Sequence, residues 1–435
     1  MNISKYHSLI EILKKEITPA LGCTEPVTVA LAAAWAAKAA GGTPKAITIR
    51  VDKNVYKNGL GVGVPGTGEF GLHIAAAAGA VAGDPKLGLE VLNPLTDDDV
   101  RHAKALLASE NVAVNMQTGT TGVYVDAVVT SDIAEGLASI RDRHDNVTSV
   151  LRDNAVFPEF QKLGEQGRAE ADTESFNPIH QYRLDELMEC IQYAPLDKLR
   201  FLKTSLEANT TFARNSLEQS TQSRIGSSML RLMEKGRIHG DLIGKMKYWL
   251  ASAVEARMGG FNMTVVSCAN SGNQGLISTI PVVLAAEHVG ASEELLLRAA
   301  ALSSLITVYV KSFMGVLTPV CGGSVAAGLG AACAITYLFG GDSDAIERTI
   351  KNMAGSVMGI ICDGAKTGCA LKTSMAVGVA LENAFLALEG VTVPADNGIV
   401  DASADQTIRN MGHVTKPGMS QTDDAILEIM TRRYQ

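Results

Sequence analysis

The first forty residues place apolar side chains at helical spacing. Residues 1–16 alternate between apolar and charged positions as an amphipathic helix does, and residues 26–40 (PVTVALAAAWAAKAA) predict a second helix. Thr24 is expected to cap the second helix, and Pro26 suits its first turn. We expect both helices, within residues 1–41, to pack with the C-terminal part of the chain.

The pattern changes near residue 43, where short β-branched segments with partial alternation begin. Between these segments, Glu69–Ala82 and Asp97–Ala108 keep helical spacing. This mixture of strands and helices predicts an α/β module, which we place at residues 42–155. The predicted strands are Ala46–Val51, Val112–Met116, Val123–Thr130 and Val147–Leu151.

Residues 156–180 are polar, contain Pro and Gly and show no sustained period, which predicts a linker. Helical spacing dominates residues 181–435, and no segment there has the pattern of a sheet. The predicted fold class is therefore α+β: a large, mostly helical C-terminal domain, with the α/β module inserted after the N-terminal helices. The predicted helices of this domain are 182–194, 196–218, 222–235, 239–258, 273–288, 291–311, 323–339, 343–360 and 370–389.

Two long stretches without charge raise the question of a membrane. Met258–Ala286 and Ser312–Gly341 each exceed the roughly 20 residues that a spanning helix needs. Both are rich in Gly, Ala, Ser, Thr, Asn and Gln, and Pro281 and Pro319 lie within them. Spanning helices rely instead on Leu, Ile, Phe and Val. We therefore expect helices buried in a protein core, and no membrane partner.

Charge and cysteine content narrow the functional class further. The formal net charge is −8, and no block of Lys and Arg with interleaved aromatic residues occurs, so nucleic acid is not an expected partner. The N-terminal residues carry charges among their apolar positions, unlike a signal peptide. Seven cysteines without a secretory signal favour free thiols or metal ligands in a cytoplasmic protein.

The segment Gly22-Cys23-Thr24-Glu25-Pro26 places a cysteine directly before a predicted helix. The helix dipole and free N–H groups lower the pKa of a thiol there, which suits a thiolate nucleophile or base. If Glu25 points inward, its charge raises the pKa of Cys23 instead. The alternative is a small residue buried at a helix junction.

A second set of cysteines lies in glycine-rich surroundings near the C-terminus. Cys321 precedes an Ala-rich helix, and Cys362 and Cys369 flank a loop between two helices, so that all three could converge on one centre. Thiolates at helix N-termini suit an anionic cluster. Four protein ligands would favour a closed zinc or electron-transfer site, whereas three leave one iron open to substrate. The alternative is three unrelated core cysteines.

Other motifs are less specific. Gly61, Gly63 and Gly66 fit a dinucleotide-binding pattern, but the preceding strand ends some ten residues earlier. Lys366 could form a Schiff base with pyridoxal phosphate, although no other feature supports that cofactor. The histidines, His144 among them, form no pair with metal-ligand spacing, and we expect most of the histidines at the surface.

Four motifs together resemble a known family. The runs ITPALGCTEPVTVALAAA, SGNQGLISTIPVV, PVCGGSVAAG and CDGAKTGCALK are similar to those of the L-cysteine desulfidase family (UPF0597-like), which is related to the iron–sulfur L-serine dehydratase alpha chain. The resemblance implies an enzyme with a [4Fe–4S] cluster and no pyridoxal phosphate, which degrades L-cysteine to pyruvate, ammonia and sulfide. It implies that Cys321, Cys362 and Cys369 hold the cluster and that Cys23 is an acid/base.

These expectations define a catalytic site for a small amino-acid substrate. Removal of the weakly acidic Cα proton requires a base at that carbon and a Lewis acid for the carboxylate charge. Cys23 would take the proton, and Lys366 is a second catalytic candidate. An L-serine or threonine dehydratase with the same cluster is the alternative enzyme, and a non-catalytic regulatory protein that binds a small molecule or metal is the alternative of another class. A homodimer is also expected. The candidate substrate-binding residues are Thr24, Glu25, Ser271, Asn273 and Gln274.

Overall fold

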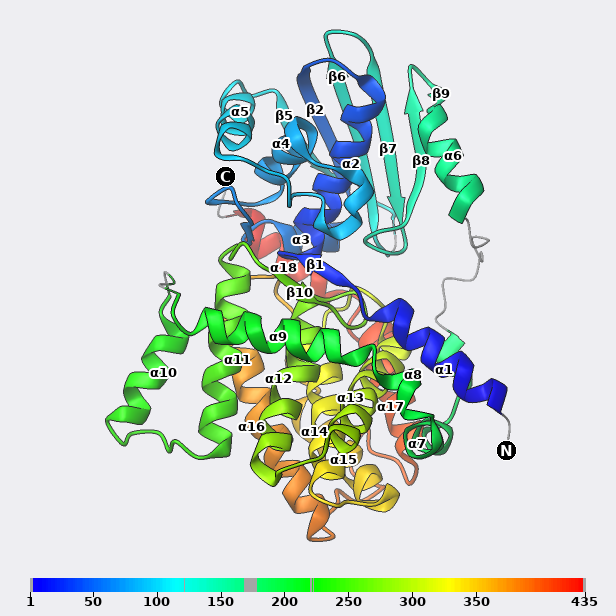
Figure 1. Ribbon diagram of the computed structural model, residues 1–435, viewed down its shortest axis with the longest axis vertical. Coiled ribbons are helices and arrows are strands. Elements are labelled where there is room, and N and C mark those ends of the chain that lie inside the picture. The colour runs from blue at the N-terminus through cyan, green and yellow to red at the C-terminus, as the bar shows by residue number, and fades with distance from the viewer. Residues whose placement is uncertain (1–2, 121, 168–177, 220, 222, 433–435) are drawn as a thin grey trace.

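A computed structural model describes residues 3–120, 122–167, 178–219, 221 and 223–432. Figure 1 shows an α/β part above a larger helical part, as expected for the α+β class. The sheet of the upper part has the strand order β5-β2-β6-β7-β8-β9, in which only β2 and β5 are parallel. These strands are β2 Pro44–Val51, β5 Val112–Met116, β6 Tyr124–Ser131, β7 Glu135–Arg141, β8 Val147–Arg152 and β9 Ala155–Val156.

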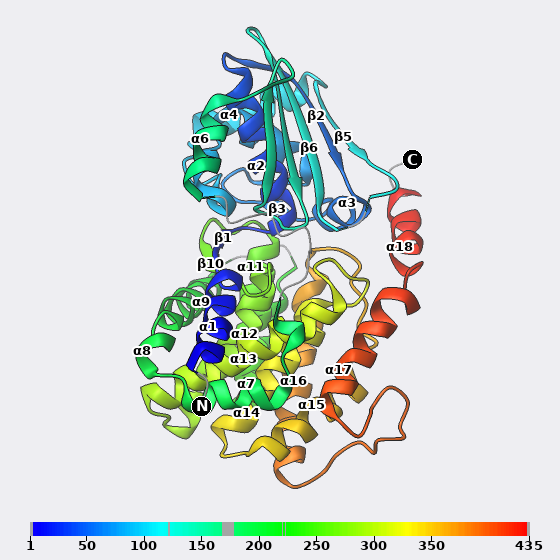
Figure 2. The ribbon, with the colours of Figure 1, turned by 90° about the vertical axis from the view of Figure 1, so that its right-hand side faces the viewer.

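Two helices, α2 (Thr24–Ala40) and α4 (Leu72–Ala82), cover one face of this sheet (Figure 2). Their small side chains allow a close approach: a Cβ added to Gly79 of α4 would lie 2.2 Å from the Ala30 carbonyl oxygen of α2. The other elements of the α/β part are α3 Lys53–Gly59, β3 Gly63–Val64, β4 Glu69–Phe70, η1 Pro85–Glu90, α5 Asp97–Ala108 and α6 Pro158–Gly167.

The position of α2 corrects one expectation about the N-terminal helices. Helix α1 (Ile3–Glu16) packs with the helical part, whereas α2 packs against the sheet strands β6 and β7. The reason is that α2 is buried along nearly its whole length and therefore needs apolar neighbours on several sides, which the sheet and α4 supply. The cap also differs, because Cys23 and not Thr24 is the N-cap residue of α2.

Strand β7 was not predicted, because its sequence EGLASIR has few β-branched residues. The close approach of α2 requires glycine at position 136, because a Cβ there would lie 1.9 Å from the Ala36 carbonyl oxygen. The segment expected as a linker, 156–180, begins with the helix α6 and ends with η2 (Pro178–Gln181). Its residues 168–177 lie outside the described residues.

The helical part is built around α13 (Glu293–Met314), which contacts α12 and α14 along its length. Both uncharged stretches are interrupted by non-helical segments, so neither forms a single long helix. Two helices, α13 and α16, are long and apolar enough to cross a membrane, but 78% and 56% of their apolar windows are buried inside the protein. The remaining helices are α7 Leu184–Tyr193, α8 Leu196–Leu199, α9 Leu202–Ser216, α10 Ile225–Glu234, α11 Leu242–Met258, α12 Gly272–Val289, η3 Gly323–Ala327, α14 Gly328–Leu338, α15 Ser343–Val357, α16 Gly368–Leu388, α17 Ala404–His413, η4 Val414–Gly418 and α18 Thr422–Thr431.

Three connections join the two parts. Strand β1 (Pro19–Leu21) pairs with β10 (Thr264–Val266) of the helical part before the chain enters α2. The described chain leaves the α/β part with α6 and resumes in the helical part with η2. At the C-terminus, α18 returns to the α/β part and packs against α3 (Figure 2). The N-terminus of α2 and the N-terminal end of α18 therefore both lie where the two parts meet.

Candidate functional site

A cavity of about 90 Å³ lies between the α/β part and the helical part. One wall comes from the start of α2, from α3 and from the turn between β7 and β8. The opposite wall comes from α11, α12 and α13 and from the loops that precede η3 and α16. The cavity brings together nine of the ten residues that the sequence singled out: Cys23, Thr24, Glu25, Ser271, Asn273, Gln274, Cys321, Cys362 and Cys369.

Cys321 and Cys362 are held side by side by backbone pairing. Val320 and Ile361 form an isolated β-bridge, and the Cys362 N–H donates to the Pro319 carbonyl at 2.7 Å. Cys369 lies in the first turn of α16, and its thiol donates to the Gly364 carbonyl at 3.6 Å. Burial, together with the neighbouring Cys321 and Cys362, raises the pKa of Cys369 to about 12. All three thiols are free and line the same cavity.

These three thiols fit the donor chemistry of an iron–sulfur cluster. The described residues contain no group of three His, Cys, Asp or Glu side chains arranged around a single metal ion. Each iron of a cluster takes its own thiolate, so its ligands need not converge on one point. Gly322, beside Cys321, has no side chain of its own, and a Cβ there would lie 3.2 Å from Gln274 Nε2 and 3.3 Å from the Lys311 ammonium nitrogen. Burial lowers the pKa of Lys311 to about 8, and its ammonium donates to the Val316 carbonyl.

Cys23 and Glu25 form a buried pair on the other wall. The Cys23 thiol donates to Glu25 Oε2 at 3.0 Å, Thr24 Oγ1 donates to the same oxygen at 3.1 Å, and Asn58 Nδ2 donates to Oε1 at 2.9 Å. Burial raises the pKa of Glu25, but attraction to His144 and these hydrogen bonds outweigh it, so the pKa ends below its ordinary value. The Glu25 carboxylate is therefore an anion that accepts a hydrogen bond from the Cys23 thiol.

The pKa of Cys23 corrects the expectation of a thiolate stabilised by the helix. Burial and the charge of Glu25 raise the pKa of Cys23 well above that of an ordinary thiol, and Arg257 opposes this only in part. The thiol also makes no capping bond to the helix N–H groups. Glu25 does point inward, which was the condition for a raised pKa. Cys23 is thus a thiol at neutral pH and becomes a strong base once deprotonated.

A buried arginine holds the N-terminal turn of α12. Arg257 Nη2 donates to the Gly22 carbonyl at 2.6 Å, and Nη1 donates to Asn273 Oδ1 at 3.0 Å. These bonds join the residue before Cys23 to the first turn of α12. Ser271 is the N-cap of α12, and Gln274 lies in the first turn of that helix.

Lys366 is the one candidate whose side chain does not line the cavity. Its ammonium pairs with Asp363, at 2.9 Å from Oδ2 and 2.6 Å from the backbone carbonyl oxygen. Lys372 pairs with the same carboxylate and donates to the Ile361 carbonyl. Both of these contacts lie within the loop between Cys362 and Cys369. Lys366 therefore stabilises this loop instead of lining the cavity.

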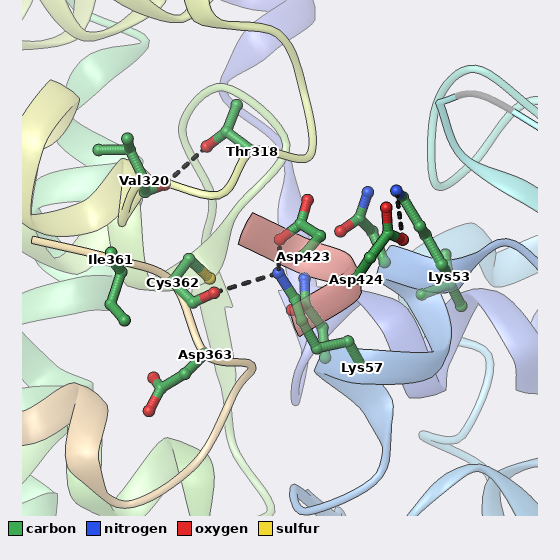
Figure 3. A network of polar contacts seen from close by, with 12 residues as sticks. Lys53, Lys57, Thr318, Val320, Ile361, Cys362, Asp363, Asp423 and Asp424 are labelled. Atoms are coloured by element: carbon green, nitrogen blue, oxygen red, sulfur yellow. Dashed lines mark hydrogen bonds and ion pairs between the residues drawn. The ribbon is translucent and has the colours of Figure 1, made fainter. Parts of the chain in front are cut away.

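Several residues at the site had no signal in the sequence. Lys57 of α3 is 1% exposed and donates to Asp423 Oδ1 at 2.5 Å and to the Cys362 carbonyl at 3.1 Å (Figure 3). Most of the histidines were expected at the surface, whereas His144 is 2% exposed and lines the cavity. These residues lie outside the four motifs that pointed to the site. They come together only in the tertiary structure. The residues that the sequence missed are Lys57, Asn58, His144, Arg257, Lys311 and Asp423.

Comparison with known proteins identifies the class. A family model described as serine dehydratase alpha chain matches residues 86–428, and this family contains lyases of the dehydratase type. A UPF0597 protein of Photobacterium profundum is 38% identical over 433 residues, covering 100% of both chains. A UPF0597 protein of Shewanella pealeana is 39% identical over 435 residues, and one of Caldanaerobacter subterraneus subsp. tengcongensis is 35% identical over 425 residues, each covering 98% of both chains. The chain therefore belongs to the UPF0597 family, which is related to the serine dehydratase alpha chain.

Proposed function

We propose that the protein is a [4Fe–4S]-dependent lyase that degrades L-cysteine to pyruvate, ammonia and sulfide without pyridoxal phosphate. The observation that supports this most directly is the cavity itself, in which the Cys23–Glu25 pair lies opposite three mutually close thiols. The ligand is a small amino acid, and neither nucleic acid nor a membrane is a partner. The proposed location is the cytoplasm.

Cys321, Cys362 and Cys369 would hold the cluster, and Lys57 and Lys311 lie close enough to offset the charge of their thiolates. The bound cluster supplies a Lewis acid that stabilises the negative charge developing on the substrate carboxylate. Arg257, which donates to the Gly22 carbonyl and to Asn273, provides a further buried positive charge at the cavity. Together with Ser271 and Gln274, it would orient the carboxylate.

Cys23 would remove the Cα proton in its thiolate form. The electron pair of the broken Cα–H bond forms the Cα=Cβ double bond, the Cβ–S bond breaks, and the sulfur leaves as hydrosulfide. The aminoacrylate product takes up water and gives pyruvate and ammonium. Burial and Glu25 raise the pKa of Cys23, and a base of higher pKa suits the removal of a very weakly acidic proton.

L-serine is the second candidate substrate, and the match to the serine dehydratase alpha chain favours it. Its hydroxyl replaces the leaving thiol, while the rest of the molecule presents the same groups to the cavity. The two substrates would give the same aminoacrylate, so pyruvate alone does not distinguish them. Sulfide is released only from L-cysteine.

Anaerobic purification and reconstitution test the proposal. We expect about four iron and four sulfide per chain, a stoichiometry that defines the [4Fe–4S] cluster, together with release of sulfide and pyruvate from L-cysteine. Cys362→Ser should lose most of the iron and the activity, while Cys190→Ser, at a buried cysteine on α7 outside the cavity, should keep both. A reconstituted protein without iron and without activity on L-cysteine would overturn the proposal, and pyruvate from L-serine alone would favour the dehydratase.

The pH dependence of turnover gives a separate prediction for Glu25. The charge of Glu25 raises the pKa of Cys23, so kcat should rise with pH as the thiol loses its proton. Glu25→Gln removes that charge, and the rising limb should therefore move to lower pH. Measurement of kcat for L-cysteine between pH 6 and 10 checks the direction. A limb that stays in place or moves to higher pH would contradict the role of Glu25.

A further inference from the structure

The cavity contains an unusual concentration of polar atoms without partners. Seven buried side-chain nitrogen or oxygen atoms of the described residues lack a hydrogen-bond partner, and five of these belong to residues that line the cavity. They are both ring nitrogens of His144 and one atom each of Asn58, Arg257 and Gln274. Leaving such atoms unpaired is costly in a folded protein, so their gathering in one cavity points to a polar ligand.

His144 is the most conspicuous member of this group. It lies on the turn between β7 and β8, and Thr28 Oγ1 of α2 anchors it by donating to its backbone carbonyl at 3.0 Å. The charged groups facing its ring are Glu25 from α2, Lys311 from α13, and Arg143 and Asp145 from its own turn. Burial lowers the pKa of His144, and Glu25 and Asp145 only partly offset this, so the ring is neutral at neutral pH. A neutral imidazole offers one acceptor nitrogen.

Asn58 supplies a second acceptor beside that ring, and Glu25 supplies a negative charge. Asn58 Nδ2 donates to Glu25, and Asn58 Oδ1 has no hydrogen-bond partner. The Glu25 carboxylate accepts from Cys23, Thr24 and Asn58 and is an anion at neutral pH. The wall thus offers two acceptors without partners, together with a carboxylate charge.

We propose that His144, Asn58 and Glu25 bind the α-ammonium group of a free amino acid. This inference rests on the proposed function and adds how the substrate is oriented. An ammonium carries N–H donors for the acceptors of His144 and Asn58 and a positive charge that the Glu25 carboxylate attracts. The unpartnered Arg257 Nε and the Lys311 ammonium supply positive charge for the carboxylate at the other end. The α/β part therefore contributes substrate recognition to a site whose thiols belong to the helical part.

Two inhibitors that differ in the amino group test this assignment. L-alanine carries both an ammonium and a carboxylate, whereas 3-mercaptopropanoate has the carboxylate and thiol of L-cysteine but no amino group. In His144→Leu, the inhibition constant of L-alanine should rise about tenfold or more, as expected for loss of a hydrogen bond to a charged group. The constant for 3-mercaptopropanoate should change less than twofold. His144→Gln, which keeps a neutral acceptor, should recover part of the loss.

The control is His102→Leu, at an exposed histidine on α5, which should leave both constants unchanged. If turnover of His144→Leu is too slow for inhibition kinetics, ligand-observed NMR supplies the two dissociation constants. Equal weakening of both ligands, or no weakening of L-alanine, would overturn the inference even if the wild type degrades L-cysteine. Conversely, selective loss of L-alanine binding would support it even if the wild type releases no sulfide, which separates this inference from the proposed function.

Discussion

Replacing Cys23 with serine should lower kcat for L-cysteine by roughly 10²–10⁴-fold, the usual contribution of a general base. A serine hydroxyl can still donate to Glu25, so the hydrogen bond that orients this residue is retained. Its pKa, however, is too high for an appreciable alkoxide fraction at any working pH. The substitution therefore removes the base while it keeps the geometry of the pair.

The iron content separates this effect from damage to the thiol site. Cys23 is on the α2 wall of the cavity and is not among the three thiols of the opposite wall, so Cys23→Ser should bind as much iron as the wild type. Cys190→Ala provides a matched control, because Cys190 is equally buried but lies in the core around α7. Wild-type turnover by Cys23→Ser would remove Cys23 from the mechanism. Loss of iron in this variant would show that its effect is structural.

The fold class and the site cysteines could be predicted because their signals are local. Helical spacing marks most of the C-terminal helices, and the glycines around Cys321 and the loop between Cys362 and Cys369 are contiguous in the sequence. The position of α2 could not be predicted in this way. A helix that is apolar on every side could be buried in either part of the protein. The reason for its small residues is visible only in the structure, where β7 and α4 approach its backbone closely.

The charged and polar groups of the site carry even less local signal. His144 has the sequence context of a surface turn, RDRHDN, and becomes buried because Thr28 of α2 anchors its backbone. Arg257 lies in a helix with other basic residues, and nothing in that helix indicates that its guanidinium reaches Gly22. The direction of the Cys23 pKa depended on where Glu25 pointed. Lys366 is the opposite case: it lies in a recognisable motif, but its side chain forms an ion pair with Asp363 and does not line the cavity.

Replacing Lys57 with methionine should detach the C-terminal helix from the α/β part. Lys57 and Asp423 are 1% and 8% exposed, so the substitution leaves a buried carboxylate without its partner. Removing one member of such a pair typically costs about 3–5 kcal/mol. Because α18 makes its main contact with α3, we expect this cost to appear as local opening of residues 422–431 before the whole protein unfolds.

Hydrogen exchange followed by mass spectrometry measures this opening directly. A destabilisation of about 3 kcal/mol should accelerate amide exchange in α18 by more than 100-fold. The neighbouring pair offers a matched control: Lys53 and Asp424 are joined at 2.7 Å but are 34% and 62% exposed (Figure 3). Lys53→Met should therefore change the stability of α18 by less than about 1 kcal/mol. Equal exchange rates in the two variants would contradict the importance of burial.

The double variant Lys57→Met/Asp423→Leu determines whether the charges themselves are needed. Two apolar side chains of similar size can replace a buried ion pair with little loss, because the cost of removing both charges from water also disappears. We therefore expect α18 to recover most of its protection in the double variant. Lys57 also donates to the Cys362 carbonyl, and that bond is lost in both variants. If the double variant recovers the helix but not the iron content, Lys57 acts on the cysteine loop independently of its role in docking α18.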